Sequence, residues 1–250
     1  MCTLAAYVGV SDDLPLLVAA NRDEFLDRPA ADPAVIAYGP WVVAGQDLTA
    51  GGTWFGVNEA GMVVGLLNRR RPGGPDPHCR SRGLLCLEVL QTRSPADAEA
   101  YVRATAAETY NSYNLLVADR HAAFVATNAL GRIELTPLSR GVHLLSNLEL
   151  NDPTCPRIAK SSALFRSVSL PPAAVAGAVI APLQAILSDH TTALDPRAET
   201  IDTLCVHLPG YGTRSSSIVA IDRTGATRYW HAPGPPCRTA FAEIALPPQR

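Results

Sequence analysis

Short apolar runs separated by turn-forming residues fill the first third of the chain and predict β-strands. Two of these runs, at 3–10 and 14–20, are divided by Ser11-Asp12-Asp13, which is typical of a hairpin turn. A polar loop punctuated by prolines is expected over 21–40. Further strands are predicted at 41–45, 53–58 and 62–68.

Helical patterns follow this strand-rich region, after an exposed loop rich in Pro, Gly and Arg over 69–82. One helix is predicted over 83–92. Ser94-Pro95-Ala96-Asp97 predicts the start of a second helix, because Ser can cap it, Pro suits its first position and Asp its first turn. Strands are then predicted at 113–118, 122–128, 132–138 and 142–146, helices at 157–167 and 173–190, and strands at 203–207, 215–222 and 227–230.

The helices thus stand in blocks between runs of antiparallel-looking strands, which indicates an α+β layered fold and not alternating βαβ units. A length of 250 residues suits one large core, so we expect 1–250 to form a single domain. The content of 47% hydrophobic and 18% charged residues is that of an ordinary globular protein. A net charge of −2 gives no electrostatic footprint for nucleic acid, so no such partner is expected, while an oligomer stays possible.

The cysteines and the apolar stretches indicate a cytoplasmic protein. The chain does not open with a signal-peptide pattern, and no apolar stretch reaches the ~20 residues that a membrane span needs. The six cysteines are scattered, without a C-x-x-C pair or zinc-like spacing to histidines. Neither a disulfide framework nor a structural metal is therefore expected. His207 and His231, in predicted strands, are interpreted as structural histidines without a metal partner.

Cys2 follows the initiator Met1, which methionine aminopeptidase removes when the next side chain is small. The mature chain would then begin with a thiol and a free α-amine on one residue, with unperturbed pKa values of roughly 8.5 and 7.7–8.0. Near neutrality a proton can pass between them, so one residue supplies both nucleophile and base. Cys2 is therefore a candidate N-terminal nucleophile; the alternative is an inert, small apolar residue.

Four polar clusters interrupt apolar strands near predicted strand ends, and the first is the tetrad Asn21-Arg22-Asp23-Glu24. If the first two strands pair as a hairpin, this tetrad lies near the start of the chain. The Arg22 guanidinium could then lower the pKa of the Cys2 thiol, and the Asp23 carboxylate could accept a hydrogen bond from the α-amine. The alternative is a surface turn with an internal ion pair.

The other three clusters offer hydrogen-bond donors. They lie at 51–58 with 65–68, at 144–147, and at 210–217. Asn68 and Asn147, each ending a predicted strand, could donate to an oxyanion, although Asn is also a common turn former. Arg214 could bind a carboxylate or stabilise a Cys2 thiolate.

Together these motifs resemble the NRDE-domain family, whose eukaryotic members are called transport-and-Golgi-organisation proteins. The matching segments are Cys2, NRDE at 21–24, GTWFGVN at 52–58, SRG at 81–83, LSN at 145–147 and YGTRSSS at 211–217. Six ordered motifs covering nearly the whole chain are specific, although each alone would be weak.

That family is similar to the N-terminal-nucleophile hydrolases of the choloylglycine hydrolase and penicillin V acylase type. The resemblance implies a four-layer αββα sandwich, with two antiparallel sheets face to face and helices outside. It implies Cys2 as nucleophile, Asp23 as partner of its amine, Arg22 beside the thiolate, Asn68 and Asn147 as oxyanion donors, and Arg214 completing a polar wall. The hydrolases read Arg-Asn-x-Asp where this chain reads Asn-Arg-Asp-Glu, so the matches at Arg22 and Asp23 are offset.

The implied reaction is acyl transfer from a small, non-peptide amide, without a cofactor. The Cys2 sulfur would attack the carbonyl while the α-amine takes the proton, and water would release the thioester. Each oxyanion donor contributes roughly 3–4 kcal/mol in other acyl-transfer enzymes.

The competing hypothesis is a non-catalytic carrier of haem or an acyl lipid on the same fold, since the eukaryotic relatives are discussed in terms of haem or lipid handling. Cys155-Pro156 is a dipeptide seen in regulatory haem sites, although a helix start gives the same pattern. His78-Cys79 is a weaker candidate. An apolar cleft with Arg22 and Arg214 would also hold a propionate or a fatty acyl carboxylate. A hydrolase requires Cys2 to be N-terminal, whereas a carrier tolerates Met1.

Overall fold

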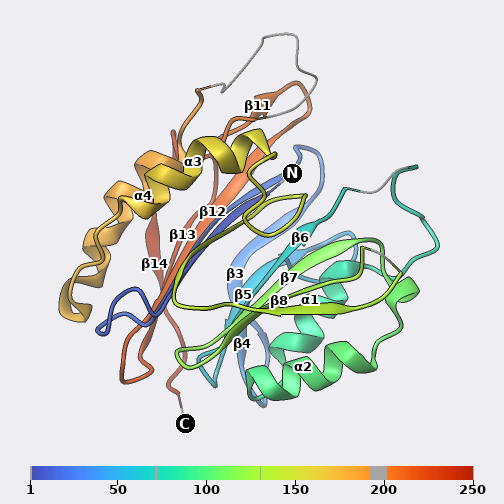
Figure 1. Cartoon of the computed structure of the whole chain (residues 1–250), viewed down its shortest axis with the longest axis horizontal. Coiled ribbons are helices and arrows are strands. Elements are labelled where there is room, and N and C mark those ends of the chain that lie inside the picture. The colour runs from blue at the N-terminus through green and yellow to red at the C-terminus, as the bar shows by residue number, and fades with distance from the viewer. Residues whose placement is uncertain (1, 71–72, 130, 192–201, 250) are drawn as a thin grey trace.

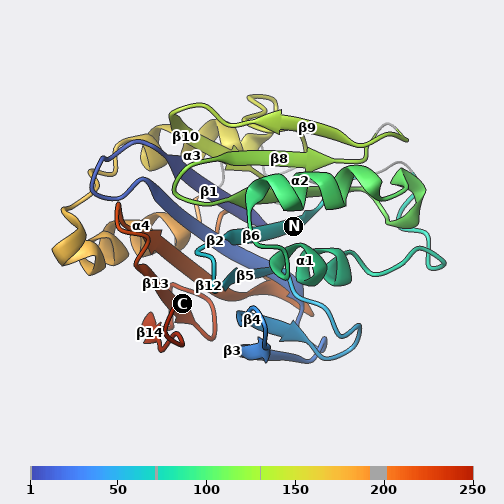
Figure 2. The ribbon, with the colours of Figure 1, turned by 90° about the horizontal axis from the view of Figure 1, so that it is seen from below.

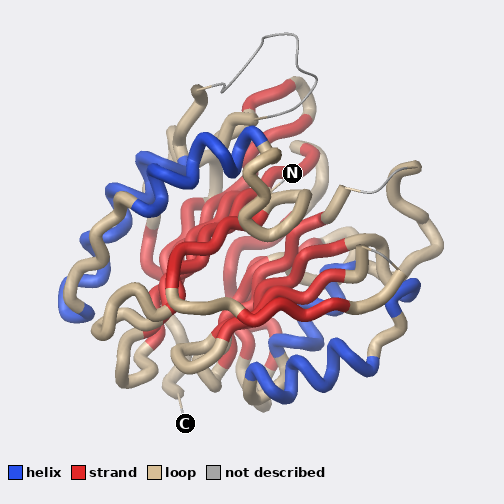
Figure 3. Tube along the Cα trace, in the orientation of Figure 1, coloured by secondary structure: helices blue, strands red, loops and turns tan. Residues whose placement is uncertain are grey.

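Two antiparallel β-sheets lie face to face, and helices cover the outer face of each (Figure 1). This arrangement comes from a computed structural model that describes residues 2–70, 73–129, 131–191 and 202–249. Figure 3 shows the strands gathered between two separate groups of helices. The order helix, sheet, sheet, helix confirms the predicted α+β fold as a four-layer αββα sandwich.

The first sheet has seven strands in the order β10-β1-β2-β12-β13-β14, with the short β11 paired to β12. Its strands are β1 (Thr3–Val8), β2 (Leu16–Phe25), β10 (Gly141–Leu145), β11 (His207–Leu208), β12 (Tyr211–Ile221), β13 (Thr227–Ala232) and β14 (Ala242–Ile244). The predicted N-terminal hairpin forms within this sheet, with Thr3 paired to Asn21. The start of the chain therefore lies beside the polar end of β2.

The second sheet is a meander of seven strands in the order β3-β4-β5-β6-β7-β8-β9. Its strands are β3 (Ala30–Ala37), β4 (Val42–Asp47), β5 (Phe55–Asn58), β6 (Val63–Asn68), β7 (Tyr113–Ala118), β8 (Ala123–Thr127) and β9 (Glu134–Pro137). The bounds of β7 coincide with the predicted strand at 113–118, where an apolar run is buried along its whole length.

The helices divide between the two outer faces (Figure 2). The second sheet carries α1 (Arg82–Leu90) and α2 (Pro95–Ala104), and the first sheet carries α3 (Pro156–Arg166) and α4 (Ile180–Leu187). Short 3₁₀ turns occur at η1 (Ala107–Thr109) and η2 (Ala173–Val179). Ser94 caps α2 as predicted, because its hydroxyl accepts a hydrogen bond from the amide of Asp97 at 3.1 Å. Among the described helices, none is long and apolar enough to cross a membrane.

Side chains of β2 alternate between two layers of the core. Leu16 and Val18 pack between the two sheets, whereas Leu17 and Ala19 pack against α3 and α4. The alternation follows from the pleat of a strand, in which neighbouring side chains point to opposite faces. The polar residues at the end of β2 follow the same alternation, so neighbouring side chains of the tetrad face different layers.

The prediction of a loop over 21–40 is wrong. Instead, β2 continues to Phe25 and a further strand, β3, follows. The polar end of β2 stays extended because β12 pairs with it along its whole length. Pro33 is tolerated in β3 because this strand lies at the sheet edge, and its register shifts between Ala31 and Ala34.

Two further predictions need correction. The strand expected at 203–207 is reduced to the two residues of β11. The helix expected over 173–190 is divided into η2 and α4, with non-helical backbone at Val175. The C-terminal strand β14 carries no clear sequence signal and was not predicted.

Candidate active site

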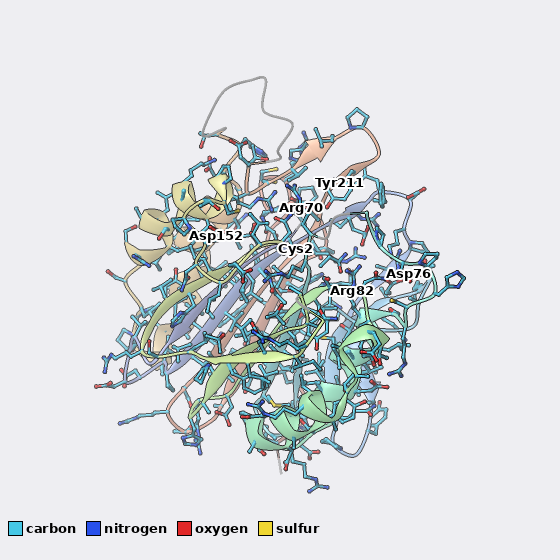
Figure 4. The ribbon with its side chains drawn as sticks, turned by 45° about the vertical axis from the view of Figure 1, so that its right-hand side comes forward. Cys2, Arg70, Asp76, Arg82, Asp152 and Tyr211 are labelled. Carbon is cyan, nitrogen blue, oxygen red and sulfur yellow. The ribbon has the colours of Figure 1, made fainter. Side chains whose placement is uncertain are left out.

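Cys2 lies just before β1 and lines a cleft at one end of the sandwich. The cleft encloses about 1520 Å³ including its open mouth. Its walls come from the end of β2, the 47–54 loop, the end of β6 and the segment 75–83. In Figure 4, Cys2 lies at the centre of the face on which Arg82, Asp76 and Tyr211 are labelled.

The cleft wall combines charged and aromatic side chains. Its arginines are Arg22, Arg28, Arg80 and Arg82, its acidic residues include Glu24, Asp47 and Asp76, and its aromatic residues are Phe25, Trp54 and Tyr211. Arg28 is ion-paired with Asp47, and Arg80 with Glu88. Arg82 donates instead to the carbonyl of Ser112 at 2.9 Å, an uncharged acceptor.

Arg22 faces the second sheet from β2, next to Cys2. Its guanidinium lies 4.1 Å from the ring centroid of Trp54, and its Nη2 is 3.9 Å from Glu24 Oε2. Burial raises the pKa of the Cys2 thiol, and the charge of Arg22 acts against that rise. The Cys2 Sγ also lies 3.8 Å from the carbonyl oxygen of Asp23. The predicted proximity of Arg22 to Cys2 is therefore present.

The Asp23 side chain points the other way, into the layer between β2 and α3. Its carboxylate accepts from Arg157 Nη1 at 2.9 Å and from Thr213 Oγ1 at 2.7 Å. Arg157 Nη1 also donates to Thr3 Oγ1 at 2.9 Å, one residue after Cys2. Burial raises the pKa of Asp23, while Arg157 and Thr213 act to lower it. The carboxylate thus fixes the elements around Cys2 from behind.

Arg157 is the site residue that sequence analysis missed. It is 2% exposed, although it opens α3 directly after the Pro156 that starts the helix. All but one of the 21 Lys and Arg residues are arginine, so its residue type gave no signal. Arg157 is identified as part of the site only by the close approach of α3 to β2 in the folded structure.

Asn21, the first residue of the tetrad, holds two segments that are remote in the sequence. Its side-chain amide donates to the carbonyls of Leu187 and Leu204, each at 2.9 Å. The residue is almost fully buried. Asn21 therefore joins the end of α4 and the segment before β11 to β2.

The two proposed oxyanion donors occupy different places. Asn68 ends β6, is exposed, and lines the cleft together with Cys2. Asn147 is buried, and its carbonyl accepts from the amide of Arg70 at 2.9 Å. Among the described residues that line the cleft, Asn147 is not found. Asn114 supports the Asn147 loop by donating to the carbonyls of Ser146 and Leu148.

Arg214 is likewise not among the described residues of the cleft wall. The register of β12 against β2 shifts between Thr213 and Ser215, which makes Arg214 the extra residue of a β-bulge. Its guanidinium donates to the carbonyls of Phe25 and Leu26. Arg214 therefore fastens the end of β2.

The first glycine of the GTWFGVN motif and the glycine of the SRG motif have a common explanation. A Cβ on Gly52 would lie 2.2 Å from the carbonyl carbon of Gly83, so the two backbones meet at a distance that only glycine allows. The amide of Thr53 donates to the carbonyl of Gly83 at 3.0 Å. This contact places the start of α1, and with it Arg82, against the cleft.

Cys155 is buried, and its Sγ lies 3.2 Å from Ser146 Oγ among the side chains under α3. The Cys155 thiol therefore has no open face for an iron ligand. Cys79 lines the cleft, and its Sγ lies 3.6 Å from the carbonyl oxygen of Glu108.

Four potential metal ligands lie close together, which their spacing in the sequence does not predict. His190, Cys205, His207 and Cys237 gather beside β11, because the fold joins segments whose spacing in the sequence matches no zinc pattern. His207, interpreted above as structural, is exposed and belongs to this group. His231 is buried as expected, with its Nδ1 3.0 Å from Ser217 Oγ.

Solved structures with the same fold belong to the N-terminal-nucleophile hydrolases. Penicillin V acylase from Agrobacterium tumefaciens aligns with a TM-score of 0.56 and 15% identity, over 97% of this chain and 86% of that one. The Caenorhabditis elegans ortholog of N-acylethanolamine-hydrolyzing acid amidase gives a TM-score of 0.51 and 12% identity, over 87% of this chain and 92% of that one. At such identities the likeness defines the fold alone.

Residues 1–232 match the family Transport and Golgi organisation 2, and the chain belongs to that family. The Transport and Golgi organization protein 2 homolog of Bos taurus is 30% identical over 232 residues, which are 84% of this chain and 83% of the bovine protein. The Homo sapiens homolog is 29% identical over the same shares. The family resemblance carried by the six motifs is confirmed.

Proposed function

We propose that this protein is an N-terminal-nucleophile hydrolase that cleaves small, non-peptide amides through a thioester on Cys2. The proposal rests above all on the position of Cys2, which opens into a large cleft with the Arg22 guanidinium beside it. The fold supports it, because the N-terminal-nucleophile architecture presents the first strand at such a cleft. Sharing a fold does not by itself establish an activity, so the site carries the argument.

In the proposed reaction, removal of Met1 leaves Cys2 with a free α-amine. The amine takes the thiol proton as sulfur bonds to the amide carbonyl carbon, and the carbonyl electron pair moves onto oxygen. When the carbon–nitrogen bond breaks, the ammonium returns that proton to the leaving amine. Water then attacks the thioester, which yields a carboxylic acid and restores the thiol.

Arg22 and Asp23 are proposed to prepare Cys2 for this step. Arg22 favours the thiolate through its charge. The β1–β2 register, with Thr3 opposite Asn21, brings residue 2 beside the Arg22-Asp23 segment that would hold the α-amine. Arg157 and Thr213 keep the Asp23 carboxylate in place, which makes them positioning residues.

Asn68 is proposed as the oxyanion donor, because it lines the same cleft as Cys2. Asn147 is proposed to support it from the neighbouring loop, through the bond between its carbonyl and the amide of Arg70. Arg214 is proposed to hold the end of β2 through its two main-chain contacts.

The charges of the cleft favour a substrate with a carboxylate. Arg82 is held by an uncharged carbonyl, and Arg22 is stacked on Trp54 with a carboxylate only at 3.9 Å. Two guanidinium groups in one cleft suit an anionic group, and the apolar Leu66 and Trp54 suit an acyl chain. N-acyl amino acids combine both features.

The test compares two forms of the protein that differ in one residue. A cleavable tag is removed to leave either Cys2 or Gly-Cys2 at the N-terminus, and both forms are incubated with a panel of N-acyl amino acids. The form beginning with Cys2 should release the amine. Blocking the α-amine should lower the rate by about 10²-fold or more, the range of general acid–base catalysis.

Cys2→Ala serves as the inactive control, and Cys86→Ala, on the buried face of α1, as the matched cysteine control. Equal turnover by the two N-terminal forms would contradict the proposal. So would the absence of both amine release and a thioester adduct on the Cys2 form, as measured by intact mass.

A carrier function is the second candidate, favoured by the size of the cleft and by its apolar wall beside Arg22. A carrier would bind the carboxylate of a fatty acyl group or of haem, and no reaction would take place at Cys2. Titration with haem and with a fatty acid distinguishes the two functions, because a carrier binds equally well in the Cys2 and Gly-Cys2 forms.

A further inference from the structure

Four potential metal ligands from separate parts of the chain converge beside β11, the strand labelled at the top of Figure 1. They are His190, after α4; Cys205 and His207, around the start of β11; and Cys237, in the turn after β13. Each offers one ligand atom, and the four atoms lie within 4.8 Å of one another. The cluster lies apart from the cleft that holds Cys2.

The spacing of three of the ligand atoms is that of one face of a tetrahedron around a small cation. The two Sγ atoms of Cys205 and Cys237 are 3.7 Å apart, and His207 Nε2 lies 3.6 and 3.3 Å from them. Zinc bonds of about 2.3 Å to sulfur and 2.0–2.1 Å to nitrogen give tetrahedral edges of about 3.8 Å and 3.5 Å. The three separations among Cys205, His207 and Cys237 therefore match before any ion is added, and the ligand atom of His190 lies within 4.8 Å of the other three.

His190 has the hydrogen bond that a metal-binding histidine needs. Its Nδ1 lies 3.2 Å from the carbonyl oxygen of Cys205. Donation from Nδ1 leaves Nε2 with its lone pair as the ligand atom, and such an outer hydrogen bond fixes the tautomer at most metal-bound histidines. The rings of His190 and His207 have centroids 5.0 Å apart, and a ligand nitrogen of each lies within 4.8 Å of the other ligand atoms.

The backbone holds the ligands together without the ion. The amides of Leu204 and Cys205 both donate to the carbonyl of Asp189, at 3.2 and 3.0 Å. Gln184, on α4, donates to the carbonyl of Pro236 at 2.8 Å, next to Cys237. The end of α4 therefore anchors both cysteine-bearing segments.

We infer that His190, Cys205, His207 and Cys237 form a structural site for a tetrahedral divalent cation of the zinc type. Two thiolates and two imidazoles are a donor set that zinc prefers. Four protein ligands close the coordination shell, which leaves no position for a substrate or water. The site stabilises the end of the sandwich and takes no part in catalysis.

The site also braces the wall behind Cys2. The amide of Val206, next to Cys205, donates to Thr213 Oγ1 at 2.9 Å, and that hydroxyl donates to Asp23. The bound ion would hold β11 against the neighbouring turn, and so fix the hydroxyl that supports the Asp23 carboxylate.

The experiment measures metal content of the full chain, purified through a histidine-free tag from zinc-supplemented cells. Elemental analysis should find one zinc per chain. Cys205→Ser and Cys237→Ser should lose it, and His207→Ala, at an exposed ligand, should weaken retention against a chelator. Replacement by Co²⁺ should give the intense absorption of tetrahedral cobalt with thiolate charge-transfer bands, lost in Cys237→Ser.

Cys79→Ser and His121→Ala are the matched controls, because neither residue belongs to the cluster, and both should keep one zinc. The inference is overturned if the wild-type chain retains no zinc and gives no tetrahedral cobalt spectrum. A disulfide between Cys205 and Cys237 in protein purified under reducing conditions, seen as a mass loss of two hydrogens, would also overturn it.

Discussion

Arg157 of α3 and Asp23 of β2 form an ion pair with a 2.9 Å separation between Nη1 and Oδ2, and their side chains are 2% and 0% exposed. The same guanidinium nitrogen donates to Thr3 on β1. One arginine thus ties the helix layer to the two strands that flank Cys2. A buried pair of this kind fixes geometry more than it adds stability.

Arg157→Met should destabilise the protein strongly. The substitution leaves the Asp23 carboxylate buried without its cation, which costs about 3–5 kcal/mol in comparable proteins. Urea unfolding followed by circular dichroism measures the free energy of unfolding. Arg166→Met, at the exposed end of the same helix, is the control and should change it little.

A double variant separates charge from packing at this pair. Arg157→Met combined with Asp23→Leu removes both charges, and it should recover much of the stability lost in Arg157→Met alone. A double variant less stable than the single one would show that the pair acts through shape and not through charge.

Arg22→Met should shift the reactivity of Cys2 to higher pH. Arg22 lowers the pKa of the Cys2 thiol, so its removal raises that pKa, and a higher pH is needed to form the thiolate. Alkylation of Cys2, followed by peptide mass spectrometry over a pH series that extends well above the thiol's usual pKa of about 8.5, gives the midpoint. Arg132→Met, at an exposed arginine, should leave it unchanged; an unchanged midpoint in Arg22→Met would refute the role.

Asn21→Asp should destabilise the protein although the two side chains have nearly the same shape. The carboxylate cannot donate to the carbonyls of Leu187 and Leu204, and each lost hydrogen bond at a buried group costs about 1–3 kcal/mol. Thermal unfolding should show a clear fall in the transition temperature. Asn111→Asp, at an amide in an exposed hydrogen-bonded pair, is the matched control and should have a small effect.

Gly52→Ala should disturb the cleft by steric overlap. The added methyl would lie 2.2 Å from the backbone of Gly83, and overpacking of this kind costs about 1–3 kcal/mol or more. Gly177→Ala, with no neighbour closer than 4.0 Å, is the control. Equal stability of the two variants would mean that the backbones separate at no cost.

The fold was predictable because apolar periodicity and turn residues report local structure directly. The run at 113–118 is buried along its length and forms β7 as predicted. The end of β2 was not predicted as a strand, because the polar run Asn21, Arg22 and Asp23 is typical of a loop. Its extended conformation depends on partners in β12 and α3. Tertiary pairing therefore determines the strand conformation at the end of β2, where the local sequence alone favours a loop.

The candidate site divides in the same way. The hairpin predicted that Arg22 lies beside Cys2, since Cys2 directly precedes β1 and Arg22 lies on the neighbouring β2. Arg157 could not be predicted, because its role depends on the approach of α3 to β2 and not on its own sequence context. The ligand cluster was missed for a related reason: Cys237 reaches Cys205 only after β13 has returned alongside β12.

The alternation of β2 makes the tetrad a strand with two separable sides. Arg22 points toward Trp54 in the cleft, whereas Asn21 and Asp23 point into the helix layer. Substitution of Arg22 therefore alters the lining of the cleft, whereas substitution of Asn21 or Asp23 alters the stability of the fold, so these two properties can be changed independently. Inserting a single residue upstream would exchange the two sides and abolish both properties together.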